Sequence, residues 1–150
     1  RFFINPHQGR VRRPVKFITL AGAERRVLGL KKYLIKWEGK SRSKLQKSVK
    51  KKLKKHWKTH IVFEEFPVAG TRMTFDFYNS NKRVAVEVQG AQHDRYVPFF
   101  HGNNAYNHIS QLKRDDDKCQ FCELNDITLV EILPTDDLTD AFLRNIGVIS

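Results

Sequence analysis

The segment from Met73 to Asp94 has two acidic residues embedded in apolar stretches. Its sequence, MTFDFYNSNKRVAVEVQGAQHD, predicts two short β-strands joined by a polar turn, with Asp76 in the first strand and Glu87 in the second. An unpaired carboxylate is costly to bury. Two carboxylates on neighbouring strands are accommodated when a hard cation such as Mg²⁺ lies between them. The segment therefore predicts a divalent-metal site.

The proportions of residue types are those of one globular domain. The 150 residues are 40% hydrophobic and 29% charged, which is enough apolar material for a core. The sequence predicts no transmembrane helix, and the N-terminus lacks the apolar core of a signal peptide. Cys119 and Cys122 are expected to be reduced thiols of an intracellular protein, since a zinc site would need distant histidines.

The net charge of +12 is concentrated in the first part of the chain. Residues 31–60 contribute +12 and residues 1–30 contribute +6, whereas residues 61–150 contribute −6. A basic half beside an acidic half predicts a polyanion, nucleic acid, bound next to the metal site. The alternative is a lysine-rich helix that is merely solvated.

Apolar periodicity predicts the order helix, three strands, helix, strand between Ser43 and Leu133. Such an order is typical of an α/β protein whose central sheet is flanked by helices. The expected helices are one that begins at Ser43, one over roughly His108–Leu124, and a last one within Asp136–Ile146. The expected strands are His60–Val68, Met73–Tyr78, Val84–Gln89 and Thr128–Leu133. Before them we expect an extended element at Val15–Leu20, a helix from Ala23 to about Leu30 and a turn at 38–40.

Gln46 has two interpretations on the helix that begins at Ser43. Ser43 and Gln46 fit the S-x-x-Q capping box. Gln46 also falls within the apolar stripe formed by Leu45, Val49, Leu53 and Trp57. Its side chain is therefore expected either to serve only as a cap or to face the interior.

One pattern of residues consists of Asp76, ten further residues and then Glu87-Val88-Gln89. This pattern resembles the signature of the PD-(D/E)xK nuclease superfamily, with Gln89 in the place usually held by lysine. The surrounding residues are similar to the branch that includes very-short-patch-repair-type endonucleases and phage homing endonucleases. The segments that carry this similarity are Phe75–Tyr78, Ala85–Gly90 with His93, and Arg114-Asp115 followed by Lys118 and Ile127–Ile132. The resemblance covers roughly residues 43–133.

The resemblance implies a restriction-endonuclease-like αβββαβ core with a mixed sheet. It also implies Mg²⁺ (with Mn²⁺ as a substitute) held by Asp76, Glu87 and the Val88 carbonyl. Phosphodiester hydrolysis fits such an ion, because a metal neutralises phosphate oxygens and lowers the pKa of an attacking water. The alternatives are a turn-capping role for Asp76 and a solvent-facing edge position for Glu87.

Four further residues are candidates for catalysis: Gln46, Gln89, His93 and Lys118. Gln89 cannot carry the positive charge of a lysine, so Lys118 is the candidate to supply it. Alternatively, Lys118 belongs to a solvated face with the preceding aspartates. His93 is expected to activate water or protonate the leaving group, or else to be a surface histidine. Gln46 lies where family members often carry a glutamate.

The expected function is a Mg²⁺-dependent endonuclease acting on double-stranded DNA, of the homing type carried by phages or mobile elements. The alternatives are a repair nickase or junction-resolving nuclease, and a DNA-binding module with a decayed active site. Residues 1–42 are expected to form a basic arm and residues 43–150 the catalytic core, in a cytoplasmic protein (host-cell cytoplasm if phage-encoded) without membrane contact. A symmetric target would favour a homodimer. The expected DNA contacts are a groove-binding loop at Phe99–Asn107 and the basic residues Arg10, Arg12, Arg13, Lys16, Arg42, Lys44, Lys51, Arg72 and Arg95.

Overall fold

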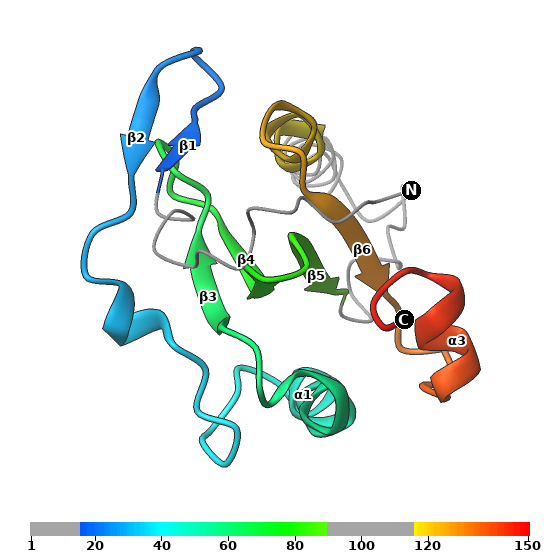
Figure 1. Ribbon diagram of the computed structural model, residues 1–150. Coiled ribbons are helices and arrows are strands. Elements are labelled where there is room, and N and C mark those ends of the chain that lie inside the picture. The colour runs from blue at the N-terminus through cyan, green and yellow to red at the C-terminus, as the bar shows by residue number, and fades with distance from the viewer. Residues whose placement is uncertain (1–15, 90–115) are drawn as a thin grey trace, which may run out of the picture.

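The computed structural model describes residues 16–89 and 116–150, arranged around a mixed four-stranded sheet (Figure 1). Its strands are β3 (Val62–Pro67), β4 (Thr74–Asn79), β5 (Val84–Val88) and β6 (Thr128–Ile132), in that spatial order. Neighbouring strands are antiparallel from β3 to β5, and β6 runs parallel to β5. The mixed α/β class is confirmed, and the described elements follow the predicted order. Of the helix predicted over roughly His108–Leu124, only residues 116–124 lie among the described residues.

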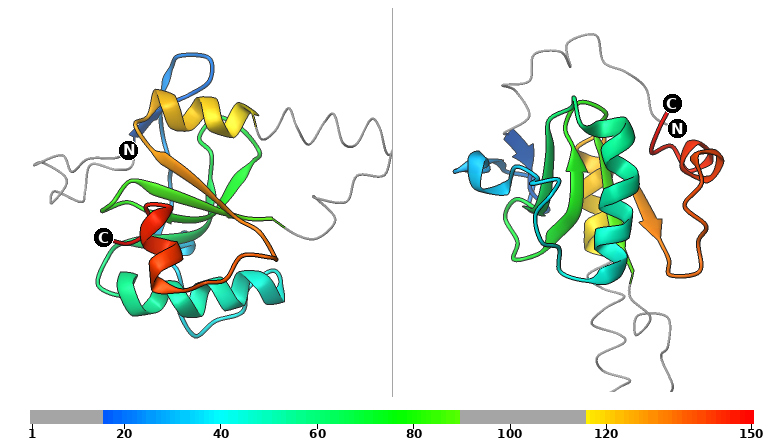
Figure 2. Two further views of the ribbon diagram at one scale, coloured as in Figure 1. Left: turned by 90° about the vertical axis from the view of Figure 1, so that its right-hand side faces the viewer. Right: turned by 90° about the horizontal axis from the view of Figure 1, so that it is seen from below.

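Helices cover both faces of the sheet (Figure 2). One face carries α1 (Lys44–Trp57) and α3 (Asp140–Asn145), with Val49, Leu53 and Leu143 in its apolar cluster. The other face carries the helical residues 116–124 together with a two-stranded hairpin, β1 (Lys16–Ile18) and β2 (Glu24–Arg26). Phe17 of the hairpin packs against Phe121 of that helix, with ring centroids 5.7 Å apart.

The sequence of β5 sends alternate residues to the two faces, as the period of a strand requires. Val84, Val86 and Val88 pack into the cluster beneath α1. Ala85 packs into the opposite cluster, and Glu87 shares that face. The valines therefore anchor α1, while Glu87 points toward the face that carries residues 116–124.

α1 begins where its capping residue predicts. The Ser43 hydroxyl accepts a hydrogen bond from the Gln46 backbone N–H at 3.1 Å, which satisfies one free donor of the first turn. At the other end, buried Trp57 donates its indole N–H to the Val148 carbonyl at 3.1 Å. This bond ties the end of α1 to the chain after α3.

The predicted helix from Ala23 to Leu30 is wrong. Residues 24–26 form β2, and only the 3₁₀ helix η1 (Leu30–Tyr33) follows. Gly22 and Gly29 adopt left-handed backbone conformations, with φ of 88° and 65°, which interrupt a helix at both ends. The extended element predicted at Val15–Leu20 is confirmed as β1, and pairing with it overrides the helical propensity of the Ala-Glu-Arg-Arg run.

The last helix is shorter than the predicted range. α3 starts at Asp140, because the Thr139 side chain caps it by accepting from the Phe142 N–H. In the described ranges 16–89 and 116–150, no helix is long and apolar enough to cross a bilayer.

Candidate active site between β4 and β5

The site lies where the pairing of β4 with β5 stops. The ladder runs from Asn79↔Val84 to Phe77↔Val86 and ends there. Beyond the last pair, the two strands are joined by hydrogen bonds between backbone N–H groups and side-chain carboxylates. The Asp76 N–H donates to Glu87 Oε2 at 3.0 Å, and the Val88 N–H donates to Asp76 Oδ2 at 2.7 Å. These reciprocal bonds hold the two carboxylates next to each other.

Both carboxylates are buried in the body of the sheet. Asp76 and Glu87 are each 8% exposed. β5 lies between β4 and β6, so the alternative that placed Glu87 on a solvent-facing edge strand is wrong. Asp76 does not cap a turn either, because it lies within β4 and bonds to the neighbouring strand.

The environment disfavours the charged form of Asp76. Burial, and after it the negative charge of Glu87, raises the pKa of Asp76 to about 7. The hydrogen bond from Val88 and the charge of Lys118 oppose this rise but do not cancel it. Two adjacent carboxylates are thus only partly compensated by the protein, which is a common property of metal-binding and catalytic sites.

Lys118 is the cation that the structure places beside the pair. Its ammonium nitrogen lies 2.5 Å from Glu87 Oε1, and its side chain is only 15% exposed. The helical residues 116–124 carry it, and Cys122 on the same face is buried against the sheet. The alternative of a solvated Lys118 is therefore wrong.

Gln89 does not take the place of a lysine. It follows β5 directly and is buried, and its side-chain amide donates to Glu131 Oε2 at 2.7 Å. The positive charge next to Glu87 comes from Lys118 instead. The amide at position 89 serves as a hydrogen-bond donor to a carboxylate of β6.

Gln46 faces the interior. Its side chain is 2% exposed and donates from Nε2 to Glu64 Oε2 at 2.9 Å and to Glu65 Oε2 at 3.1 Å. The interpretation of Gln46 as a cap alone is wrong, because only its backbone N–H bonds to Ser43. The amide thus links α1 to two adjacent glutamates of β3.

Glu65 is a neighbour of the site that the sequence analysis missed. It lies between the pairs Glu64↔Phe77 and Phe66↔Phe75, opposite Asp76, and its charge helps to raise the pKa of Asp76. Its φ of 54° is unusual for a residue other than glycine. Two successive glutamates in a strand indicate that one of them faces inward, but the alternation of a strand does not tell which one.

A buried ion pair fixes α1 to the sheet and was also missed. Lys50 is 1% exposed, and its Nζ lies 2.9 Å from Glu64 Oε1. The same nitrogen donates to the Gly39 and Lys40 carbonyls at 3.3 and 3.4 Å. One lysine of the basic helix is therefore structural rather than available to a ligand.

The donor set of the pair suits a hard divalent cation. Within the described part of the chain, no group of three or more His, Cys, Asp or Glu residues is placed to hold a metal ion. Mg²⁺ commonly uses only one or two carboxylates and completes its shell with waters and substrate phosphates. Asp76 and Glu87 provide those two carboxylates. Asp76 Oδ1 has no hydrogen-bond partner among the described residues, so it is free to act as a ligand.

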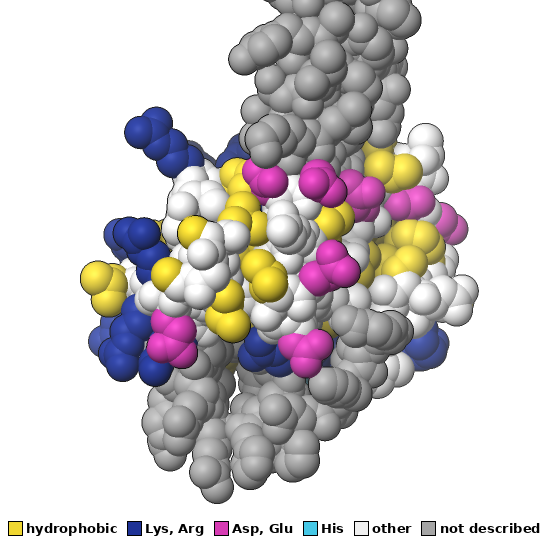
Figure 3. Space-filling model, turned by 90° about the horizontal axis from the view of Figure 1, so that it is seen from above, with side chains coloured by type: hydrophobic (Ala, Val, Ile, Leu, Met, Phe, Trp, Pro, Cys, Tyr) yellow, Lys and Arg dark blue, Asp and Glu magenta, His cyan; other side chains and the backbone are white. Residues whose placement is uncertain are grey.

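Several predicted DNA-contacting residues are accessible. Lys44, Lys51 and Arg72 are exposed, and Lys16 forms only a 3.9 Å ion pair with Glu24. Arg42 is exposed but pairs with Glu65 at 2.5 Å. Figure 3 shows one face of the molecule, with most Lys and Arg at one side and most Asp and Glu toward the other. The predicted residues Arg10, Arg12, Arg13, His93, Arg95 and the loop 99–107 lie outside the described residues.

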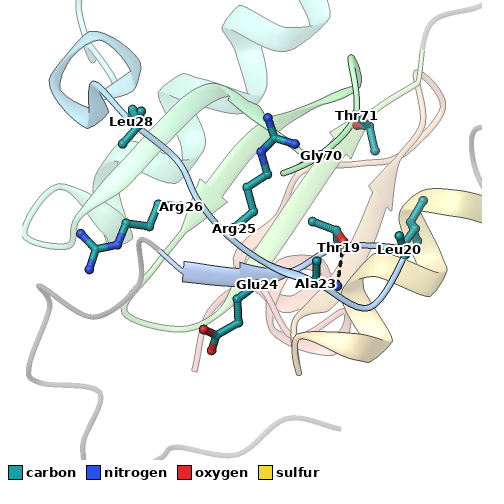
Figure 4. Close-up of a pocket in the computed structure, with 10 residues that line it drawn as sticks. Thr19, Leu20, Ala23, Glu24, Arg25, Arg26, Leu28, Gly70 and Thr71 are labelled. Atoms are coloured by element: carbon teal, nitrogen blue, oxygen red, sulfur yellow. Dashed lines mark hydrogen bonds between the residues drawn. The ribbon is translucent and has the colours of Figure 1, made fainter.

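A cavity of about 740 Å³ lies away from the carboxylates, against the β1–β2 hairpin (Figure 4). Thr19, Leu20 and Arg25 line it from the hairpin, and Gly70 and Thr71 line it from the turn between β3 and β4. Neither Asp76 nor Glu87 contributes to its lining. The cavity is therefore separate from the candidate active site.

Comparison with known proteins finds similarity to viral proteins. The chain is 31% identical over 99 residues to "Uncharacterized protein 033L" of Invertebrate iridescent virus 3, covering 62% of this chain and 50% of the relative. It is 31% identical over 80 residues to "Uncharacterized protein 094L" of Frog virus 3, covering 53% and 52%. It is 36% identical over 61 residues to "Uncharacterized protein 307L" of Invertebrate iridescent virus 6, covering 40% and 30%. The chain thus spans about half, or less, of the length of these relatives. No family model and no solved structure matches it.

Proposed function

We propose that this protein is a divalent-metal-dependent endonuclease that hydrolyses phosphodiester bonds in duplex DNA, on a core of the PD-(D/E)xK type. The observation that carries the proposal is the buried pair of Asp76 and Glu87, bonded to each other's strands and faced by Lys118. Two carboxylates and a lysine are the groups that metal-assisted phosphodiester hydrolysis needs.

Asp76 and Glu87 would hold Mg²⁺ or Mn²⁺, with the Val88 carbonyl as a further oxygen ligand. When bound, the ion supplies charge neutralisation at the phosphate and a more acidic water. The protein fixes the two carboxylates through the bonds between Asp76, Glu87 and Val88, so their orientation is set before a ligand arrives. Lys118 contributes a positive charge beside the scissile phosphate, in the role that Gln89 cannot fill.

The distribution of charge supports nucleic acid as the substrate. Residues 31–60 contribute +12, and in α1 Lys44, Lys51 and Lys55 are exposed. These lysines lie on α1, which covers the sheet face opposite to that of Glu87, so they support binding of a polyanion to this protein rather than contact at the carboxylates themselves.

The alternative of a decayed DNA-binding module rests on the two glutamines, Gln46 and Gln89, and cleavage of DNA decides it. Gln46 donates to Glu64 and Glu65, and Gln89 donates to Glu131. Each amide therefore has a defined role as a donor to a carboxylate. Three further expectations stay predictions: that the enzyme is of the homing type, that it forms a homodimer, and that it is cytoplasmic.

Cleavage of DNA tests the proposal. Supercoiled plasmid and long linear duplex are incubated with the protein in Mg²⁺, in Mn²⁺ and in a chelator, and the ends are mapped. We expect metal-dependent cleavage that Asp76→Asn and Glu87→Gln each lower by at least about a hundredfold. Glu123→Gln, on the exposed side of the helix that carries Lys118, is the matched control and should retain activity. Cleavage that persists in both site variants would contradict the proposal.

The products separate the alternatives. Paired cuts at a defined duplex sequence favour a site-specific endonuclease of the homing type. A single-strand nick at a mismatch favours a repair nickase, and paired cuts across a four-way junction favour a resolving nuclease.

A further inference from the structure

The contact between Lys118 and Glu87 puts an ammonium group at the carboxylate that a divalent cation would use. Nζ of Lys118 lies 2.5 Å from Oε1 of Glu87, which is a short, charge-assisted contact. The other oxygen of Glu87, Oε2, accepts from the Asp76 N–H at 3.0 Å. Both oxygens of Glu87 are therefore engaged by partners within the protein.

A lysine and a divalent cation repel each other strongly when they share one buried carboxylate. Their separation would be only a few ångströms, and the surroundings screen charge much less than water does. Lys118 and Glu87 are both largely buried, so solvent screens this repulsion poorly. A cation can thus bind fully to Glu87 only if Lys118 moves away.

Lys118 has a natural second partner if the substrate is DNA. A lysine side chain is long and flexible, and its ammonium binds phosphate oxygens as readily as carboxylates. A phosphate at the site would accept Lys118 and at the same time offer an oxygen to the cation. Lys118 would then exchange Glu87 for phosphate without losing an ionic partner.

We propose that Lys118 competes with the divalent cation for Glu87 in the DNA-free protein and transfers to a DNA phosphate when the cation binds. This inference rests on the proposed function and adds a consequence to it. Metal and DNA bind cooperatively, and each raises the affinity for the other by the same factor. The free protein consequently holds its metal weakly, and the complete site assembles on the substrate.

Metal binding without DNA tests the competition. Mn²⁺ is titrated calorimetrically into the wild-type protein and into Lys118→Gln. We expect Lys118→Gln to bind Mn²⁺ at least about tenfold more tightly, because the competing charge is gone. Lys54→Gln is the matched control: it removes another lysine–glutamate pair, with Glu38 on the surface, and should leave the affinity unchanged.

A second measurement avoids any folding defect of the variant. Lys118→Arg keeps the charge and should bind Mn²⁺ as weakly as the wild type. In the wild type, a short phosphorothioate duplex that resists hydrolysis should tighten Mn²⁺ binding by about tenfold or more, and Lys118→Gln should lose most of this gain.

The outcomes separate this inference from the proposed function. If the wild type binds Mn²⁺ and Lys118→Gln binds it equally or more weakly, the competition is overturned while the metal site stands. If neither protein binds Mn²⁺, with or without the duplex, the metal site itself is overturned and the competition with it.

Discussion

At the scale of single residues, Asp76 shows how the site departs from what stability alone would favour. Its pKa is raised to about 7, mainly by burial and by the charge of Glu87. Between about pH 4 and pH 7 the folded protein keeps a proton on Asp76 that the unfolded chain has released. Stability of the metal-free protein should therefore fall as the pH rises through this window, with the full penalty present above pH 7.

Replacing Asp76 by asparagine should stabilise the metal-free protein at high pH. The asparagine side chain removes the charge and keeps an oxygen that accepts from the Val88 N–H. One pKa unit corresponds to about 1.4 kcal/mol, so we expect Asp76→Asn to raise the free energy of unfolding by at least that amount at pH 8. The difference should shrink toward zero near pH 4.

Urea unfolding in a chelator at several pH values measures this effect. Asp137→Asn, at an exposed position, is the control and should show no such pH-dependent gain. A destabilised Asp76→Asn protein at pH 8 would show that the carboxylate is needed for structure rather than for binding a ligand.

Tyr78 offers a second test at this scale. Its hydroxyl is buried without a hydrogen-bond partner among the described residues, and burial raises its pKa to about 12. Tyr78→Phe removes an unsatisfied polar atom and keeps the ring that stacks on Phe66. We expect the free energy of unfolding to stay equal or rise by up to about 1 kcal/mol. A loss larger than that in urea unfolding would reveal a partner for the hydroxyl.

At the scale of elements, α1 is attached to the sheet by charge as well as by apolar contacts. Lys50 and Glu64 form a buried pair, and Gln46 donates to the same glutamate. Lys50→Ala would leave Glu64 buried without its cation, so we expect a loss of about 3–5 kcal/mol. Lys51→Ala, one residue further along α1 and exposed, should change stability by less than about 0.5 kcal/mol.

Thermal and urea unfolding of the two alanine variants check this contrast. Equal effects of Lys50→Ala and Lys51→Ala would mean that the ion pair is not maintained in solution. The comparison is direct because the two lysines are adjacent in sequence and differ in burial and in the ion pair with Glu64.

The elements that the sequence predicted best are those with a clear apolar period. The alternation of Val84, Val86 and Val88 predicted β5, and the Ser43 cap predicted the start of α1. β2 was missed because its residues favour a helix locally, whereas pairing with β1 is a tertiary effect. No local pattern distinguishes these two outcomes.

The candidate site was predictable in its acidic residues and in Lys118, but not in Glu65. Asp76 and Glu87 were recognisable because they interrupt apolar strands. Lys118 was a candidate because Gln89 cannot supply a positive charge, and the alternative of a solvated face was left open. Glu65 depends on a left-handed backbone conformation and on the register of β3 with β4, and neither is encoded by a local motif.

At the scale of the whole molecule, the separation of a basic region from an acidic region is the feature that would favour binding of a polyanion. Lys44, Lys51 and Lys55 lie along one exposed stripe of α1. Replacing all three by glutamine should weaken DNA binding uniformly across sequences. If each lysine contacts a phosphate, the slope of log K against log salt should become shallower by about 0.9 per lysine.

Fluorescence anisotropy of a labelled duplex over a range of salt concentrations measures the slope. Arg144→Gln, an exposed position on α3, is the control for loss of a positive charge elsewhere. An unchanged slope of log K against log salt in the triple variant would show that DNA does not bind along α1.

The central claim is that Asp76 and Glu87 together hold a divalent cation, and Mn²⁺ binding tests it most directly. Electron paramagnetic resonance of free Mn²⁺ is recorded at pH 8 during titration with the wild type and with Asp76→Asn, in the presence of the phosphorothioate duplex. We predict that the wild type removes Mn²⁺ from solution, that Mg²⁺ displaces it, and that Asp76→Asn binds at least about a hundredfold more weakly while remaining folded. Binding by Asp76→Asn equal to that of the wild type would contradict the account.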